Sequence, residues 1–133
     1  MRQLIYTSQA TALGARDMAL TLEEVLSHSI QNNRLVDVTG FLLIRDGMFL
    51  QLLEGPERSV ETTFRRIAAD ERHAQITVIS DTQGARRLFS EWNMGAVRDS
   101  GPSVRVLDAQ AARHLLQTVA EQHRAAERQA LLG

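Results

Sequence analysis

Residues 36–56 read VDVTGFLLIRDGMFLQLLEGP, and this stretch decides the fold. Val36 to Ile44 predicts a β-strand, and Asp46-Gly47 is a strong signal for a two-residue hairpin turn. Met48 to Leu53 predicts the partner strand, and its residues are apolar on both faces. Such a strand is expected at the centre of a sheet that other elements cover on both sides.

The segments around this hairpin complete a mixed pattern of strands and helices. QLIYTS (3–8) predicts a first strand, and a loop with Gly14 follows it. A helix then begins near Asp17, or at a capping box formed by Thr21 and Glu24. Its apolar residues recur at helical spacing, and they are Met18, Leu22, Val25, Leu26 and Ile30.

The remaining elements define the fold class. Pro56 opens a second helix that is expected to run to about Asp70. Strands follow at 75–80 and 93–98, with a loop at 86–92 between them. The order β-α-β-β-α-β-β predicts an α+β, ferredoxin-like sheet with both helices on one face.

We expect one domain at residues 1–98, a linker at 99–107 and a helical extension at 108–133. The linker begins with DSGPS, which combines three residue types that favour loops. The extension predicts one long helix or two shorter ones. Because two helices on one face leave the other face bare, we expect the C-terminal helices, or a second subunit, to cover it.

Composition excludes several classes of function. The chain has 133 residues, no cysteine and a formal net charge of −1, so a thiolate metal site and a cysteine nucleophile are ruled out. The arginines are scattered, which does not favour nucleic-acid binding. The N-terminus is too short and polar for a signal peptide, and no apolar run reaches membrane length. We therefore expect a cytoplasmic protein without membrane, metal or nucleic-acid binding.

Polar residues at apolar positions point to a binding pocket. Gln51 lies among four apolar neighbours, and burying its amide without partners costs about 1–3 kcal/mol. Each such residue also has an ordinary explanation. A Tyr6–Gln51 hydrogen bond is common core polarity, Asn33 can end a helix, and Arg66 with Asp70 can form an exposed ion pair. His73 can cap the second helix.

Taken together, these residues describe a site for a flat ring. Two neighbouring helices, with Val25 facing Ile67, are expected to sandwich an apolar ring. The amides of Asn33 and Gln51 would meet its polar edge. A mostly apolar pocket with a few placed hydrogen-bonding groups is typical of a planar cofactor.

Five segments together resemble the BLUF domain, the blue-light sensor that uses FAD. They are LIYTS, NNRLVDVTGFLL, MFLQLLEGPE, RRIAADERH and FSEWNMG, and they cover residues 3 to about 98 in order. The resemblance implies that Tyr6 donates an electron and then a proton to the excited flavin. It also implies that Gln51 lies between Tyr6 and the flavin edge, where it rotates or tautomerises.

The resemblance further implies a set of cofactor contacts. Asn33 would hold the flavin carbonyl, with Asn32 and Ser29 beside it. Val25 and Ile67 would sandwich the ring. The remaining positions are Arg66 and Asp70 near the ribityl and phosphate part, and Trp92 and Met94, which would transmit the signal.

The resemblance is to short BLUF proteins that act through oligomers and partner proteins. It therefore implies a photoreceptor without an output enzyme, a homo-oligomer and an unidentified downstream protein. We expect the strand of Gln51 to border the last strand, so that a new bond to Gln51 reaches Met94 and the C-terminal helices.

Two other functions stay open for this fold. One is a small acylphosphatase-like hydrolase, for which the loop QATALGAR (9–16), with Arg16, is a weak candidate anion cradle. The other is a flavin-free, dimeric interaction module that keeps the ferredoxin-like fold. A yellow purified protein would exclude both.

Overall fold

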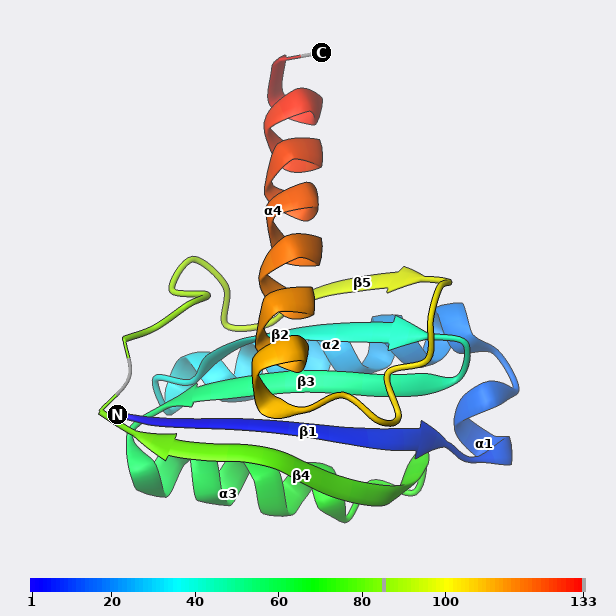
Figure 1. The fold of residues 1–133 in the computed structure, drawn as a ribbon, viewed down its shortest axis with the longest axis horizontal. Helices are drawn as coiled ribbons and strands as arrows, with labels where there is room; N and C mark the ends of the chain where they lie inside the picture. Colours follow the sequence, from blue (N-terminus) through cyan, green and yellow to red (C-terminus); the bar gives the residue numbers. More distant parts are fainter. Residues whose placement is uncertain (85, 133) are drawn as a thin grey trace.

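The structure is a computed structural model that describes residues 1–84 and 86–132. A five-stranded sheet, in the order β4-β1-β3-β2-β5, forms its middle layer. Helices α2 and α3 lie on one face, and α4 crosses the other face (Figure 1). The elements are β1 Arg2–Ala10, α1 Ala12–Ala15, α2 Met18–Leu35, β2 Thr39–Arg45, β3 Met48–Gly55, α3 Glu57–Ala68, β4 His73–Gln83, β5 Gly95–Asp99 and α4 Ala109–Leu132.

The β2–β3 hairpin forms as predicted and places β3 at the centre of the sheet. Asp46 and Gly47 both have positive φ, 50° and 80°, as the turn that matches the strand twist requires. β3 pairs antiparallel with β1 on one side and with β2 on the other. In this register Gln51 lies opposite Tyr6 and opposite Leu42.

The period of two along each strand divides the core into two layers. Ile5, Phe41 and Leu50 belong to the layer under α4, where Leu116 of that helix is fully buried. Leu4, with Leu42, Leu53 and Val60, belongs to the layer under α2 and α3. The prediction of a central strand covered on both faces is therefore confirmed.

The edges of the sheet differ from the expectation. β5 pairs with β2, in parallel, and β3 has β1 and β2 as neighbours. The prediction that the strand of Gln51 borders the last strand is wrong. The strand with which β5 pairs depends on the path that the chain takes between the two strands. The residue pattern of the last strand alone carries no information on that path.

Several element boundaries also differ. The 9–16 loop contains the short helix α1, and α2 begins after Asp17, whose side chain accepts a hydrogen bond from the Leu20 amide. Thr21 lies inside α2, where its hydroxyl donates to the Gly14 carbonyl over 2.7 Å. Ile30, expected to face the core, is 45% exposed. The C-terminal extension is one helix, α4, and among the described residues no helix is long and apolar enough to cross a membrane.

A buried carboxylate at the end of β3 anchors the segment that leads into β5. Glu54 has 0% exposure, and its two oxygens accept from the Leu88 and Phe89 amides at 2.8 Å each. The Thr39 hydroxyl and the Gln3 amide also donate to it, over 2.9 and 3.2 Å. Four donors converge on one acceptor-only group, so this end of the segment is held by the sheet.

Replacing Glu54 tests this anchor. Glu54→Gln turns an –NH2 group toward amide donors, and it should lower the free energy of unfolding by about 1–3 kcal/mol. The matched variant Glu57→Gln changes an exposed carboxylate at the start of α3, where a loss below about 1 kcal/mol is expected. Urea unfolding followed by circular dichroism measures both. Equal midpoints for the two variants would contradict the anchor.

Candidate functional site

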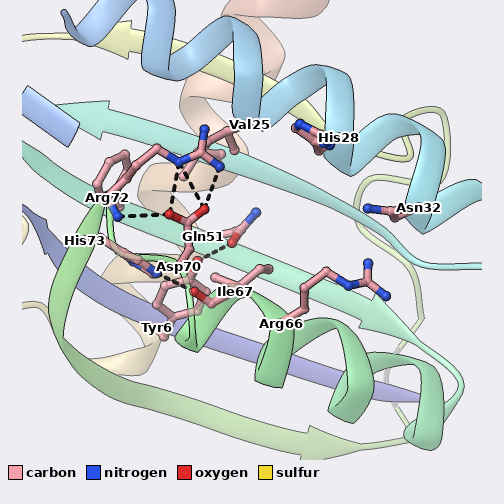
Figure 2. A pocket seen from close by; sticks show the side chains of 12 residues that line it. Tyr6, Val25, His28, Asn32, Gln51, Arg66, Ile67, Asp70, Arg72 and His73 are labelled. Carbon is pink, nitrogen blue, oxygen red and sulfur yellow. Dashed lines mark hydrogen bonds and ion pairs between the residues drawn. The ribbon is translucent and has the colours of Figure 1, made fainter. Parts of the chain in front are cut away.

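A cavity of about 260 Å³ lies between α2 and α3 over the central strands. Figure 2 shows side chains from both helices and from the sheet pointing into it. Because β1 and β3 are neighbours and each sends alternate residues to this face, Tyr6 and Gln51 meet on its floor. The lining residues are Tyr6, Val25, His28, Asn32, Leu42, Phe49, Gln51, Arg66, Ile67, Asp70, Arg72 and His73.

The Gln51 amide has one orientation that satisfies both of its neighbours. The Tyr6 hydroxyl donates to Gln51 Oε1, and Gln51 Nε2 donates to Met94 Sδ over 3.3 Å. A thioether sulfur only accepts. Turning the amide over would place Oε1 against this sulfur, so that two acceptors face each other. Met94 therefore selects the orientation in which the Gln51 carbonyl faces Tyr6.

Tyr6 is held as a neutral phenol. Its side chain is buried, with the ring of Phe64 at 5.4 Å and that of His73 at 6.3 Å between centroids. Burial raises the pKa of Tyr6 far above its ordinary range, and the negative charge of Asp70 raises it further. The phenol thus keeps its proton, which is available to the Gln51 carbonyl oxygen.

His73 fixes the end of α3 against β1. Its Nε2 lies 2.6 Å from the Ile67 carbonyl, and its Nδ1 lies 2.7 Å from the Ser8 hydroxyl. A carbonyl only accepts, so Nε2 carries the hydrogen. The prediction that His73 caps this helix is confirmed, and the bond also places Ile67 at the cavity wall.

A charged bridge ties the turn after α3 to α2 at one end of the cavity. Arg72 binds the Asp70 carboxylate with two nitrogens, the shorter distance being 2.5 Å, and donates to Glu24 of α2 over 3.1 Å. Figure 2 shows the bonds between Arg72 and Asp70 at one end of the pocket. The hydrogen bond from Arg72 lowers the pKa of Asp70, although burial opposes this.

The expected Arg66–Asp70 ion pair is absent, because Asp70 pairs with Arg72 instead. Arg66 forms no ion pair with a carboxylate anywhere in residues 1–84 and 86–132, and it lines the cavity. Its neighbour Arg65 is 79% exposed and pairs with Glu61 over 3.0 Å. The site thus presents one unpaired guanidinium.

The structure gathers most of the predicted site residues, but not all of them. Ser29 and Asn33 do not line the cavity. Asn33 is buried, and its Nδ2 donates to the Asn93 carbonyl over 2.8 Å. The predicted contacts of Ser29 and Asn33 with a flavin stay predictions. Those predicted residues that do line the cavity are Tyr6, Val25, Asn32, Gln51, Arg66, Ile67 and Asp70.

Trp92 and Met94 lie on opposite sides of the sheet. Met94 is buried in the layer under α2 and α3, beside the Gln51 amide. Trp92 packs in the layer under α4, with its ring 5.5 Å from that of Phe41. In this structure Met94 is therefore the member of the pair that faces the cavity side.

Sequence reasoning missed five lining residues. Phe49 lies two residues before Gln51 on β3, and His28 lies three after Val25 on α2, so the strand and helix periods could have found both. Arg72 had no such signal, because it lies between α3 and β4, where neither period applies. The complete missed set is His28, Leu42, Phe49, Arg72 and His73.

Backbone amides of the 9–16 segment donate hydrogen bonds to other groups of the protein. The Thr11 amide donates to the Arg72 carbonyl over 3.0 Å, and the Gly14 and Ala15 amides donate to Thr11. Gly14 also packs so closely that a Cβ would lie 2.0 Å from the Arg72 oxygen. These contacts do not favour an anion cradle. Within the described ranges, no group of three or more His, Asp or Glu residues is placed to hold a metal ion.

Known proteins are similar to this chain both in sequence and in architecture. Residues 1–95 match the family described as BLUF, sensors of blue-light using FAD. The chain is 35% identical over 92 residues to photoactivated adenylate cyclase subunit beta of Euglena gracilis, an alignment that takes in 68% of this chain and 10% of that protein. The matched part of the chain spans about a tenth of the length of its Euglena gracilis relatives.

Two solved structures show the same arrangement of elements. The ground state of BlsA has a TM-score of 0.79 at 26% identity, and the match covers 86% of this chain and 84% of that one. BlrB, a BLUF protein in its dark state, has a TM-score of 0.68 at 30% identity, with 92% of each chain covered. Since the family match takes in most of the chain, this protein belongs to the BLUF family.

Proposed function

We propose that this protein is a blue-light photoreceptor that binds FAD between α2 and α3 and signals through Gln51. The observation that carries the proposal is the hydrogen-bond chain Tyr6–Gln51–Met94 at the wall of the cavity. It joins a proton-bearing phenol, an amide that both donates and accepts, and the residue directly before β5. The family description supports the choice of cofactor.

The cavity fits the ring system of a flavin in its chemistry. Val25 and Ile67 provide apolar walls from the two helices, and the amides of Asn32 and Gln51 provide hydrogen-bonding groups. Arg66 supplies a positive charge with no ion-pair partner among the described residues. A volume of about 260 Å³ is near the lower end of the range for small-molecule sites, about 300–1,000 Å³. We expect it to take the ring and leave the adenosine outside.

FAD, when bound, supplies the absorption of blue light and an excited state that accepts an electron. In this proposal Tyr6 would give an electron to the excited ring. Its hydroxyl proton would pass to Gln51 Oε1 along the bond already present, while Gln51 Nε2 gives one proton to the ring. An electron and a proton would then return from the ring to Tyr6 within the same cycle, so that only Gln51, left rotated or in its imidic form, and its hydrogen bonds are changed.

The rearranged amide alters the contact with Met94. After rotation, Gln51 Oε1 would face the Met94 sulfur, and the Nε2–Sδ bond of 3.3 Å would be lost. Met94 directly precedes β5, whose strand pairs with β2 and lies beside α4. The change therefore has a path from the cavity to the opposite face of the sheet, where a downstream protein or a second copy of the chain would read it.

This signalling role assigns no catalytic step to the chain. The matched part of the Euglena cyclase subunit is about a tenth of that protein, and we propose that this part corresponds to its light sensor. In this proposal the cavity residues bind the ring, hold it and move a proton. Ser29 and Asn33 remain proposed flavin neighbours from the end of α2.

An absorption spectrum before and after blue light tests the proposal. A flavin spectrum that shifts to the red and recovers in the dark is expected for the native protein. Gln51→Leu and Tyr6→Phe should still bind flavin but lose the shift, because each breaks the proton path. Gln9→Leu, which alters an exposed glutamine on β1, should keep it. A shift that survives Gln51→Leu would overturn the mechanism.

Tyr6 is the only tyrosine of the chain, so its ionisation can be followed directly by ultraviolet absorption. Because burial raises its pKa, the folded protein should show no phenolate at pH 10, whereas the urea-unfolded chain should titrate near about 10. The stabilising effect of the neutral phenol is complete below the unfolded pKa and is lost as pH rises through the folded value. Phenolate in the folded protein at pH 10 would refute the buried assignment.

Arg66 and Arg65 form a matched pair for measuring cofactor binding. Arg66→Gln should weaken FAD binding about tenfold or more, because a hydrogen bond to a charged group contributes about 1.5–3 kcal/mol. Arg65→Gln should leave the affinity within about twofold, since Arg65 is exposed and pairs with Glu61. Fluorescence titration of each apoprotein with FAD measures the two constants. Equal losses would show that net charge, and not the position of Arg66, sets the affinity.

A further inference from the structure

The segment 88–94 links the cavity to α4, and the sheet holds it at its beginning. The Leu88 amide donates to Glu54 over 2.8 Å, so β3 grips this peptide from one side. The Leu88 carbonyl accepts from Nη2 of Arg124, over 3.2 Å, so α4 grips it from the other. Both backbone groups of Leu88 are thereby held, one by the central strand and the other by the C-terminal helix.

Arg124 binds the same segment at two further points. Its Nε and Nη2 donate to the Glu91 carboxylate over 2.9 and 3.1 Å. Its guanidinium carbon lies 4.9 Å from the centre of the Trp92 ring, within the range of a cation–π contact. The His123 ring packs against the same ring, with 5.4 Å between centroids and a tilt of 56°. Among the described residues, Arg124 is the one residue of α4 with hydrogen bonds to 88–94.

The far end of the segment is held by the sheet and by α2. The Trp92 carbonyl accepts from the Gly40 amide over 3.2 Å. The Asn93 carbonyl accepts from Asn33, and Met94 accepts from Gln51. The position of Met94 is therefore set at one end by Gln51 and at the other by a turn that Arg124 holds.

We propose that Arg124 is a positioning residue that couples α4 to the state of Gln51. By holding Leu88, Glu91 and Trp92, it favours the arrangement of the segment in which Met94 reaches the Gln51 amide. The proposal rests on the photoreceptor function above and names its regulation. Coupling between two sites is reciprocal: a change at Gln51 alters the grip of Arg124, and loss of that grip alters the stability of the rearranged amide.

The geometry gives the direction of the effect. The described arrangement contains both the Arg124 contacts and the Gln51–Met94 bond, so removing the first weakens the state that contains the second. The light-adapted state should then be longer-lived. Because recovery must re-form this arrangement of the segment, Arg124→Gln is expected to slow it. A loss at the lower end of typical coupling free energies, felt fully in the barrier, corresponds to about fivefold. Arg124→Lys, which keeps the charge but loses the planar two-point contact, should recover at an intermediate rate.

The same helix provides a matched control. Arg128 is 61% exposed and its bond runs to Glu121 of its own helix, so Arg128→Gln should recover at the native rate. Glu91→Gln removes the carboxylate that Arg124 binds, so it tests the same contact. It replaces Arg124→Gln if that variant does not fold. The double variant should be slowed by less than the product of the two single effects.

The measurements are dark recovery followed at the red-shifted absorption edge of the flavin, and hydrogen–deuterium exchange of α4 in the dark and under light. Arg124→Gln should also reduce the light-induced change in exchange at residues 116–132. Flavin occupancy and melting temperature are recorded alongside, because a purely structural residue would lower them without changing the recovery rate.

The outcomes separate the two proposals. Native protein without a reversible red shift would overturn the photoreceptor function and this inference together. Native protein with the shift, but with Arg124→Gln and Glu91→Gln recovering within twofold of the native rate or faster than it, would overturn the inference alone.

Discussion

The arrangement of this protein depends on one buried amide in the middle of its sheet. Gln51 lies on the central strand, where polar groups must find partners or destabilise the fold. Its partners come from two other parts of the chain, Tyr6 on β1 and Met94 before β5. A sulfur atom that only accepts fixes which way the amide points, so the ground arrangement is set by protein contacts.

The two layers of the core place different groups on the two sides of the strand that carries Gln51. On one side lie the cavity, the walls from α2 and α3, and the phenol that keeps its proton. On the other side α4 packs over the sheet (Figure 1). The segment 88–94 passes between the layers, with Met94 in one and Trp92 in the other. A rearrangement at Gln51 would therefore act on this segment, which hydrogen bonds to Glu54 and Arg124 hold in place.

The sequence predicts those features that arise from local pattern. The hairpin at Asp46-Gly47, the central strand and the inward position of Ile67 all follow from turn chemistry and from periods of two or 3.6 residues. Features that depend on distant partners were missed. The neighbour of β5 depends on a crossover, Arg72 donates to Glu24, which is 48 residues away, and the amide of Asn33 donates to a carbonyl 60 residues away. Helix α1 was missed because Gly14 is typical of a loop.

The position of Trp92 makes it a fluorescent reporter of one layer of the core. It is the only tryptophan of the chain, and it lies under α4, with Phe41, His123 and Arg124 around its ring. Indole emission therefore originates from one point, on the face of the sheet opposite the cavity. Its quantum yield and wavelength record the surroundings of the segment 88–94, whereas absorption by the proposed flavin would record the pocket. With that cofactor bound, the protein would carry a pair of optical reporters, one for each layer of the core.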